Sequence, residues 1–251
     1  MKHQSILIVL ILVLLNGTWA SEIDEAYELG LKAYESGQYN LAIQEFEKIV
    51  ESGWESSELH YNLGNAYYRD DNMAAAVWAF EKCLKSEPGH KDAAFNLSLV
   101  NLRVKDRVDI PEPPVYLKIY NQIKIYLHPG QWIILGAVLL LLISLFRMLR
   151  LIRNMGANGP IRKTENIIWV ILILTILVGL NAITDYLTKH EGIIYKDQVT
   201  ATSEPNEYST TLFIVHEGLK IKVLDTKDDW VEIELIDGKS GWIPNSSLRI
   251  I

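Results

Sequence analysis

The amino-acid sequence predicts a multidomain membrane protein with an all-α helical repeat domain, a two-helix transmembrane hairpin and an all-β small barrel. Three observations lead to this prediction: two long apolar runs after residue 128, a 34-residue repeat before them, and alternating apolar and polar residues after them. Hydrophobic residues make up 49% of the 251 positions, and much of the surplus lies in three runs, 6–15, 133–146 and 167–180. We therefore expect folded domains that flank membrane-spanning segments.

The first apolar run has the pattern of a secretory signal peptide. Lys2 gives a cationic start, residues 6–15 form an apolar core, and Thr18 and Ala20 precede a possible cleavage site. This core is too short to span a bilayer comfortably. No cysteine follows the run, so a lipoprotein signal is not expected. We predict that residues 1–20 are a signal peptide; the alternative is an uncleaved N-terminal anchor.

The second and third runs are the candidate membrane spans. Residues 129–146 and 167–184 each contain no charged side chain, and about 20 apolar residues form a transmembrane helix. Because backbone groups in hydrocarbon must bond to one another, such segments are helical. Trp132 and Tyr186 lie at run ends, where aromatic residues meet the interface. We predict spans at 129–149 and 167–187; the alternative is two buried core helices, although neither run has a polar face.

The segment between the spans is strongly basic. Its cations are Arg147, Arg150, Arg153, Arg162 and Lys163, beside the single acid Glu165. Cations in short loops mark the cytoplasmic side, so residues 150–166 are a predicted cytoplasmic loop. The signal peptide independently predicts that residues 21–128 are exported. We expect a bacterial cytoplasmic (inner) membrane protein whose N-terminal and C-terminal domains are both periplasmic.

Charge excludes one class of partner. Residues 21–128 carry 18 acids and 11 bases, and residues 188–251 carry 11 acids and 7 bases. Because nucleic-acid-binding domains are normally basic, we expect no nucleic-acid partner.

A repeat with a period of 34 residues runs through the N-terminal domain. The matching pairs are Leu29 with Leu63, Gly30 with Gly64, Ala42 with Ala76, and Phe46 with Phe80. Glycine lets two helices approach closely, and phenylalanine fills the gap to the next helix. The pattern resembles the tetratricopeptide repeat. We predict a repeat domain at 21–108, with repeats at about 23–56 and 57–90 and a capping helix at 91–106; Trp54 replaces the closing proline of the first copy.

The resemblance also implies a binding groove on the first helix of each pair. The corresponding residues are Tyr27, Leu31, Tyr34, Tyr61, Asn65, Tyr68, Arg69 and Phe95. Tyrosines in a groove give a rigid, amphipathic surface for a peptide or protein segment; the alternative is that most of them pack between repeats. Asn65 lacks the lysines that accompany it in carboxylate-binding repeats, so recognition of a C-terminal carboxylate is not expected. Cys83 is predicted to be a small buried residue rather than a redox sensor.

The connector at 109–128 begins with a proline-rich segment that breaks the preceding helix. After it, Tyr116, Tyr120, Ile123 and Leu127 recur at helical spacing. Just before a span, this pattern resembles an interfacial helix with tyrosines at headgroup depth. The alternative is that the helix packs back on the repeats.

Residues 193–251 change to a period of two, which is typical of half-buried strands. Residues 219–223 and 231–235 alternate between apolar and polar side chains, and Asp237-Gly238 is a hairpin signal. With Gly241-Trp242-Ile243, the segment resembles the bacterial SH3 domain. That resemblance implies binding of cell-wall peptides or protein segments, with Trp230 and Trp242 as a possible ligand groove; the alternative places both tryptophans in the barrel core and rim.

No catalytic pattern is present. The six histidines are scattered, a single cysteine excludes an intramolecular disulfide, and no metal-binding or phosphate-binding motif occurs. We therefore expect a protein that is not an enzyme and that has no cofactor and no metal site.

The order of these modules resembles the BatE family of the Bacteroides aerotolerance (Bat) system. The resemblance implies a scaffold in envelope assembly or in the oxidative or envelope stress response, together with membrane lipid and membrane proteins that carry von Willebrand A domains. The residues themselves predict a membrane-anchored protein–protein interaction scaffold. The alternative is a protein that binds or senses peptidoglycan through its SH3 domain.

Overall fold

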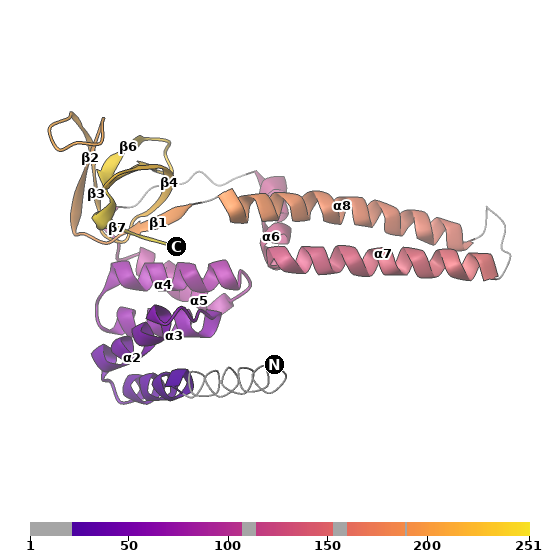
Figure 1. Cartoon of the computed structure of the whole chain (residues 1–251), viewed down its shortest axis with the longest axis horizontal. Coiled ribbons are helices and arrows are strands. Elements are labelled where there is room, and N and C mark those ends of the chain that lie inside the picture. Colours follow the sequence, from indigo (N-terminus) through magenta and orange to yellow (C-terminus); the bar gives the residue numbers. More distant parts are fainter. Residues whose placement is uncertain (1–21, 107–113, 153–159, 189) are drawn as a thin grey trace, which may run out of the picture. The chain divides into compact units, whose positions relative to one another are not determined.

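The computed structural model describes residues 22–106, 114–152, 160–188 and 190–251 (Figure 1). The predicted signal peptide at 1–20 and most of the proline-rich segment lie outside the described residues. The chain divides into two compact units. One unit contains the helices before residue 109 together with the strands after residue 190, and the other contains residues 109–190 with the short segment 87–89.

The repeat domain consists of successive helices that pack on their neighbours along the chain. Residues 22–35 are helical, and they are followed by α2 (Tyr39–Glu51), α3 (Ser57–Arg69), α4 (Met73–Ser86) and α5 (Lys91–Asn101). Helix α3 starts where the Ser56 hydroxyl accepts a hydrogen bond from the Leu59 N–H at 3.1 Å, which satisfies one backbone donor of its first turn. The predicted helical repeat region is therefore confirmed as helical, and α5 ends at Asn101, before the end of the predicted capping segment at 91–106.

The two repeat glycines allow the close helix approach that the sequence predicts. A Cβ atom added at Gly30 would lie 2.5 Å from the Phe46 ring, and one added at Gly64 would lie 2.7 Å from the Phe80 ring. Both phenylalanines are fully buried. Cys83 is also fully buried in α4, as expected for a small core residue.

The C-terminal segment forms a seven-stranded antiparallel sheet in the order β3-β2-β6-β5-β4-β1-β7. The strands are β1 (Glu191–Ile194), β2 (Gln198–Thr202), β3 (Thr211–His216), β4 (Lys220–Lys227), β5 (Trp230–Glu234), β6 (Ser240–Pro244) and β7 (Leu248–Ile250). Ile221, Val231 and Ile233 are buried, so the predicted alternation is confirmed. Strands β5 and β6 pair from Glu234 and Ser240, and Gly238 between them has φ of +85°, which a glycine adopts without strain.

The second unit contains α6 (Val115–Tyr126), α7 (Pro129–Ile152) and α8 (Pro160–Thr188), with α7 and α8 packed along each other. Helices α7 and α8 are long and apolar enough to cross a membrane, with mean hydropathies of 2.5 and 2.6. Only 11% and 28% of their apolar windows are buried. This exposure argues against two core helices of a soluble domain, because such helices are mostly buried.

Both long helices extend further into the basic segment than the predicted spans at 129–149 and 167–187. Helix α7 continues to Ile152 and α8 already begins at Pro160. Glu165 is only 4% exposed and accepts hydrogen bonds from Arg147 at 3.0 Å and Arg150 at 2.9 Å. These ion pairs hold the two helices together where the apolar runs end, which explains why helix persists beyond the first charges.

Candidate functional site

The repeats and the barrel meet at Trp78, on the outer side of α4. This tryptophan is only 2% exposed. Its indole N–H donates to the backbone oxygen of Ile250 at 2.8 Å, and the Arg249 guanidinium lies 3.4 Å from its ring centroid. A cation over an indole face is a favourable contact that strengthens when both groups are desolvated. Trp78 therefore anchors the last strand of the barrel to the repeat domain.

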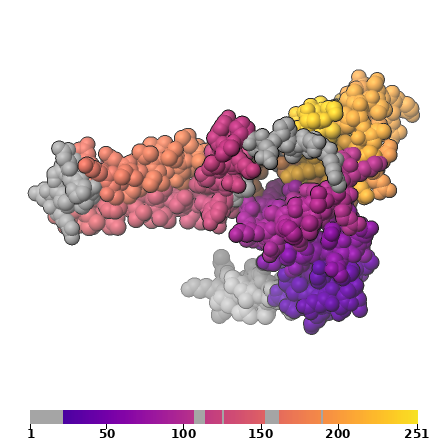
Figure 2. Space-filling model, turned by 180° about the vertical axis from the view of Figure 1, so that it is seen from behind, coloured from indigo at the N-terminus to yellow at the C-terminus, as the bar shows by residue number. Residues whose placement is uncertain are grey.

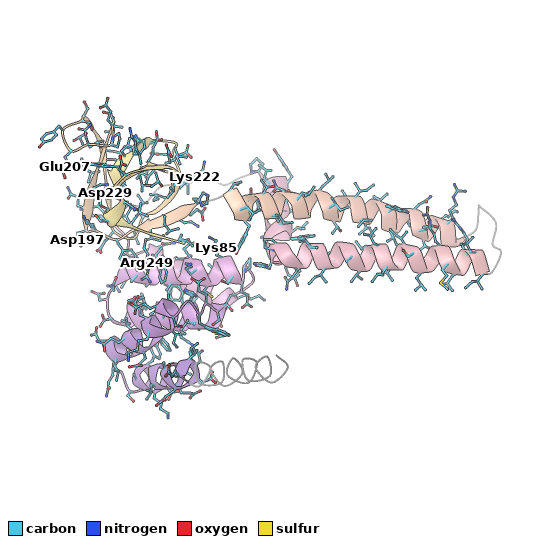
Figure 3. All side chains as sticks on the ribbon, viewed as in Figure 1. Lys85, Asp197, Glu207, Lys222, Asp229 and Arg249 are labelled. Carbon is cyan, nitrogen blue, oxygen red and sulfur yellow. The ribbon has the colours of Figure 1, made fainter. Side chains whose placement is uncertain are left out.

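Ionic contacts surround this anchor. Arg249 donates to Glu47 of α2 at 3.1 Å, and the Tyr67 hydroxyl donates to the same carboxylate. Burial raises the pKa of Tyr67, and acceptance by Glu47 raises it further, so the hydroxyl remains a donor. Figure 3 labels Arg249 at this junction, where the barrel adjoins the helices.

Lys220 of β4 adds a second ionic contact. Its ammonium lies 2.9 Å from Glu81 of α4 and 2.8 Å from Glu191 of β1. Burial by itself lowers the pKa of Lys220, but the two carboxylates outweigh burial and raise it above its ordinary value. Lys85 of α4 also donates to the backbone oxygen of Ile251 at 2.7 Å.

A separate contact joins the end of the repeat domain to the β3–β4 turn. The His216 ring lies 2.9 Å from the Asp106 carboxylate through Nδ1, and its backbone N–H donates to the same side chain. Val104 packs directly against Gly218, which has φ of +81°. These contacts place the repeats and the barrel in one unit, and Figure 2 shows the barrel surface adjoining the repeat helices.

Sequence reasoning treated the repeats and the barrel as separate domains and did not identify this junction. The available signal was Trp78 itself, a large aromatic residue in an otherwise alanine-rich helix. The positions that contact it belong to a strand 172 residues further along the chain.

The predicted groove residues lie on a different side of the repeat domain. They come from the helix at 22–35, from α3 and from α5, whereas the barrel contacts α2 and α4. We call this surface the tyrosine face, and its members are Tyr27, Leu31, Tyr34, Tyr61, Asn65, Tyr68, Arg69 and Phe95.

Several members of the tyrosine face also contact the repeat core. Tyr27 packs at 5.8 Å from Phe46 between ring centroids, and its hydroxyl accepts from Asn62 at 2.8 Å. Tyr61 lies 6.2 Å from the Phe80 ring and 4.7 Å from the His90 ring. These two tyrosines therefore serve repeat packing as well as the surface.

Other members contact residues of neighbouring helices that lie outside the tyrosine face. Asn65 of α3 accepts from Asn96 of α5 at 2.7 Å. Tyr34 packs edge-on against Tyr39 at 5.5 Å, and Arg69 donates to the Tyr39 hydroxyl. Burial raises the pKa of Tyr27 and Tyr34, which keeps both hydroxyls protonated.

The tyrosine face is most open at α5. Phe95 is 62% exposed, and Leu102, which caps α5, is exposed to the same extent. The Arg103 guanidinium lies over the Tyr68 ring, with its central carbon 5.8 Å from the centroid of that ring. The surface therefore combines polar side chains that already have partners with large apolar side chains that remain accessible.

The barrel carries a pocket of its own, with a volume of about 350 Å³. It is lined by Lys196, Gln198, Val199, Thr200, Thr202, Glu207, Thr211, Trp230, Pro244 and Ser247. Ser247 is 1% exposed, and its hydroxyl is buried without a hydrogen-bond partner among the described residues. Trp230 lines the pocket, but Trp242 does not. The register pairs Trp230 with Pro244 and Trp242 with Glu232, so the two tryptophans are diagonal neighbours on one face of β5 and β6.

No group of three or more histidine, cysteine, aspartate or glutamate side chains in the described parts of the chain is arranged to hold a metal ion.

Comparison with known families gives two matches. Residues 20–110 match the YfiO family, described as an outer membrane lipoprotein, and residues 196–249 match a family described as a bacterial SH3 domain. The C-terminal barrel is SH3-like. A comparison with curated proteins finds no match. The chain therefore combines a tetratricopeptide-like helical region, two candidate membrane helices and an SH3-like barrel, which is the predicted fold class.

Proposed function

We propose that the protein is a membrane-anchored scaffold whose tyrosine face binds a segment of a partner protein. The observation that carries this proposal is that the barrel covers α2 and α4, while Phe95 and Leu102 stay exposed. Asn65 and Tyr27 are already held by Asn96 and Asn62. Because ordered side chains lose little entropy on binding, such a surface favours association.

The contact between repeats and barrel supports a topology with both on one side of the membrane. The two segments that pack together are separated by the two candidate spans, and two spans return the chain to the side it left. Arg147, Arg150, Arg162 and Lys163 lie between or beside the inner ends of the spans, which favours a cytoplasmic turn. We therefore propose a cytoplasmic membrane protein with periplasmic repeats and a periplasmic barrel.

The order of modules supports a finer proposal, membership of a Bat complex. We propose that the partner is a membrane protein with a von Willebrand A domain, as the resemblance to the BatE family implies. The protein would then act as a scaffold without enzymatic activity in the response to oxidative or envelope stress.

Purification in mild detergent tests the scaffold proposal. We expect the wild-type chain to co-purify with such a partner, identified by mass spectrometry, and the double variant Phe95→Ala with Leu102→Ala to lose it. Trp54→Ala is the matched control, because Trp54 is 56% exposed but lies outside the tyrosine face. Retention of the partner by the double variant would remove the tyrosine face as the binding surface.

A second candidate function is binding of peptidoglycan through the barrel pocket. It is favoured by the buried Ser247 hydroxyl, which lacks a described partner, and by Trp230 on the pocket wall. A buried hydroxyl without a partner is costly, so a ligand that bonds to it would be stabilised. Lys196 and Glu207 add opposite charges that suit a peptide with both an acid and an amine.

Sedimentation of the full chain, in detergent, with purified cell-wall sacculi tests this candidate. We expect binding that Trp230→Ala abolishes and Trp242→Ala preserves, since only Trp230 lines the pocket. Sedimentation no greater than that of an unrelated detergent-solubilised protein would reject peptidoglycan as the ligand.

A further inference from the structure

Helix α6 contacts α8 through two polar pairs. The Tyr120 hydroxyl donates to Asn181 at 3.1 Å, and Lys124 forms an ion pair with Asp185. The partners are spaced by four residues on each helix, so one turn of α6 lies against one turn of α8. Tyr120, which the sequence grouped with Tyr116 and Ile123, therefore faces a protein neighbour.

Five exposed apolar side chains of α6 form a different stripe, and Leu117, which is 39% exposed, lies outside it. They are Val115, Tyr116, Ile119, Ile123 and Tyr126, and each is between 50% and 80% exposed. At about 100° per residue, these five positions fall within an arc of roughly 100°. Asn121 lies roughly 120° from the nearer edge of this arc, whereas Gln122 lies only about 20° outside it. Helix α6 therefore has one side on α8, one polar side and one uncovered apolar stripe.

The surroundings of α6 place this stripe at the end of the spans. Leu127 and His128 connect α6 directly to α7, and the Trp132 indole donates to the backbone oxygen of Lys124 at 3.3 Å. The His128 ring packs edge-on against Tyr186 of α8 at 5.5 Å. Tryptophan and tyrosine side chains of this kind concentrate where hydrocarbon meets water.

We propose that α6 lies at the membrane–water interface and inserts the stripe Val115–Tyr116–Ile119–Ile123–Tyr126 into lipid. This inference rests on α7 and α8 spanning the membrane. Lipid fits because α6 leads directly into α7, whose start is also apolar and exposed: Ile133 and Ile134 are each 64% exposed. The stripe contains no charge, and its only polar groups are two tyrosine hydroxyls, which suit headgroups.

The interface position also accounts for the polar pairs. Lys124 and Asp185 have side chains that are 14% and 29% exposed, so they form an ion pair that is neither fully solvated nor deep in a core. An ion pair within hydrocarbon would be costly, whereas at headgroup depth the cost is small. The pair therefore locks α6 against α8 at the depth that the stripe requires.

Spin labelling of the full chain in nanodiscs of phosphatidylcholine with a minor fraction of phosphatidylglycerol tests this proposal. Single cysteines replace Ile119, Ile123 or Asn121 in a Cys83→Ala background, and collision rates with oxygen and with a nickel chelate are measured. We expect oxygen to dominate at 119 and 123, because oxygen concentrates in lipid, and nickel to dominate at 121 on the polar side.

A further spin label at Ile133 distinguishes a wrong position of α6 from a wrong membrane-spanning assignment of α7. If 133 is lipid-exposed while 119 and 123 resemble 121, the stripe is in water and the proposal is wrong. If 119 and 123 are shielded from both reagents, a protein surface or a second copy covers the stripe, which also overturns it. If 133 itself is accessible to nickel, the membrane-spanning assignment fails rather than the position of α6 alone.

Discussion

The two faces of the repeat domain hold their aromatic side chains in different ways. On the face formed by α2 and α4, Trp78 is 2% exposed, its indole N–H is bonded to Ile250, and Arg249 lies over its ring. On the tyrosine face, Phe95 is 62% exposed. An aromatic side chain on a repeat surface thus becomes part of the fold when a cation and a backbone acceptor cover it. Where those partners are missing, it stays accessible for binding.

The largest expected effect comes from removing the covered aromatic. Trp78→Ala would leave a cavity and deprive Ile250 and Arg249 of their partner, so we expect a loss of about 3–5 kcal/mol in the free energy of unfolding. Chemical denaturation of the full chain in detergent measures this loss. Amide exchange in β7 should increase at the same time, because the strand is no longer anchored.

The control for this variant is Trp54→Ala. Trp54 is 56% exposed, and surface substitutions usually change stability by about 0.5 kcal/mol or less. Equal denaturation midpoints for the two variants would show that the Trp78 junction does not stabilise the chain.

The second largest expected loss of stability comes from the packing of glycine against phenylalanine inside the repeat domain. In Gly64→Ala the new Cβ would stand 2.7 Å from the Phe80 ring, which must move within a filled core. We expect a cost of about 1–3 kcal/mol from this overpacking. Gly89→Ala is the matched control, because a Cβ there meets nothing within 4 Å. Thermal unfolding compares the two, and a Gly64→Ala transition as high as that of Gly89→Ala would contradict the prediction.

Acid should weaken the covered face. His60 is fully buried and lies 5.6 Å from the Trp78 ring; its Nδ1 is 2.9 Å from the Ser56 oxygen, and its Nε2 has no partner among the described residues. Burial lowers the pKa of His60. The Ser56 carbonyl and Glu55 oppose this shift, while Lys82 and Arg249 add to it.

The sign of the effect follows from that lowered pKa. The stabilising contribution of neutral His60 is complete above the ordinary histidine pKa of about 6.5 and is lost as pH falls from there towards the lowered value. We expect unfolding free energy and β7 protection to decrease over this range. His60→Gln should flatten the dependence, whereas His190→Gln, at an exposed position, should retain it. An unchanged slope in His60→Gln would assign the acid sensitivity to other groups.

The sequence could predict features that repeat locally. Hydrocarbon requires a long apolar helix, so α7 and α8 were visible from composition; Gly64 and Phe80 recur at a fixed period; and Val231 and Ile233 alternate with polar neighbours. In each case the physical requirement acts on residues close together in the chain, and the pattern records it directly.

Contacts between distant segments leave no such pattern. The Trp78 indole N–H donates to a strand residue 172 positions away, and the Tyr120 hydroxyl donates to Asn181, 61 positions away. Trp230 and Trp242 look equivalent in sequence, yet only Trp230 lines a pocket. For the candidate site, sequence could therefore identify the helices that supply the tyrosine face, but not which side chains remain exposed.

The smallest expected effect compares two carboxylates beside the covered face. Glu55 pairs with Lys82 at 3.0 Å, but its side chain is 49% exposed, so Glu55→Gln should cost about 1 kcal/mol or less. Glu47 accepts from both Arg249 and Tyr67, and its replacement by glutamine should cost more, about 1–3 kcal/mol, because two partly buried donors lose a charged acceptor. Denaturation in low and high salt distinguishes them. The loss of stability in Glu55→Gln should disappear in high salt. The loss in Glu47→Gln should persist, because Glu47 joins Tyr67 of the repeats to Arg249 of the barrel. Equal salt sensitivity would mean that Glu47 behaves as a surface charge and does not help to secure the barrel.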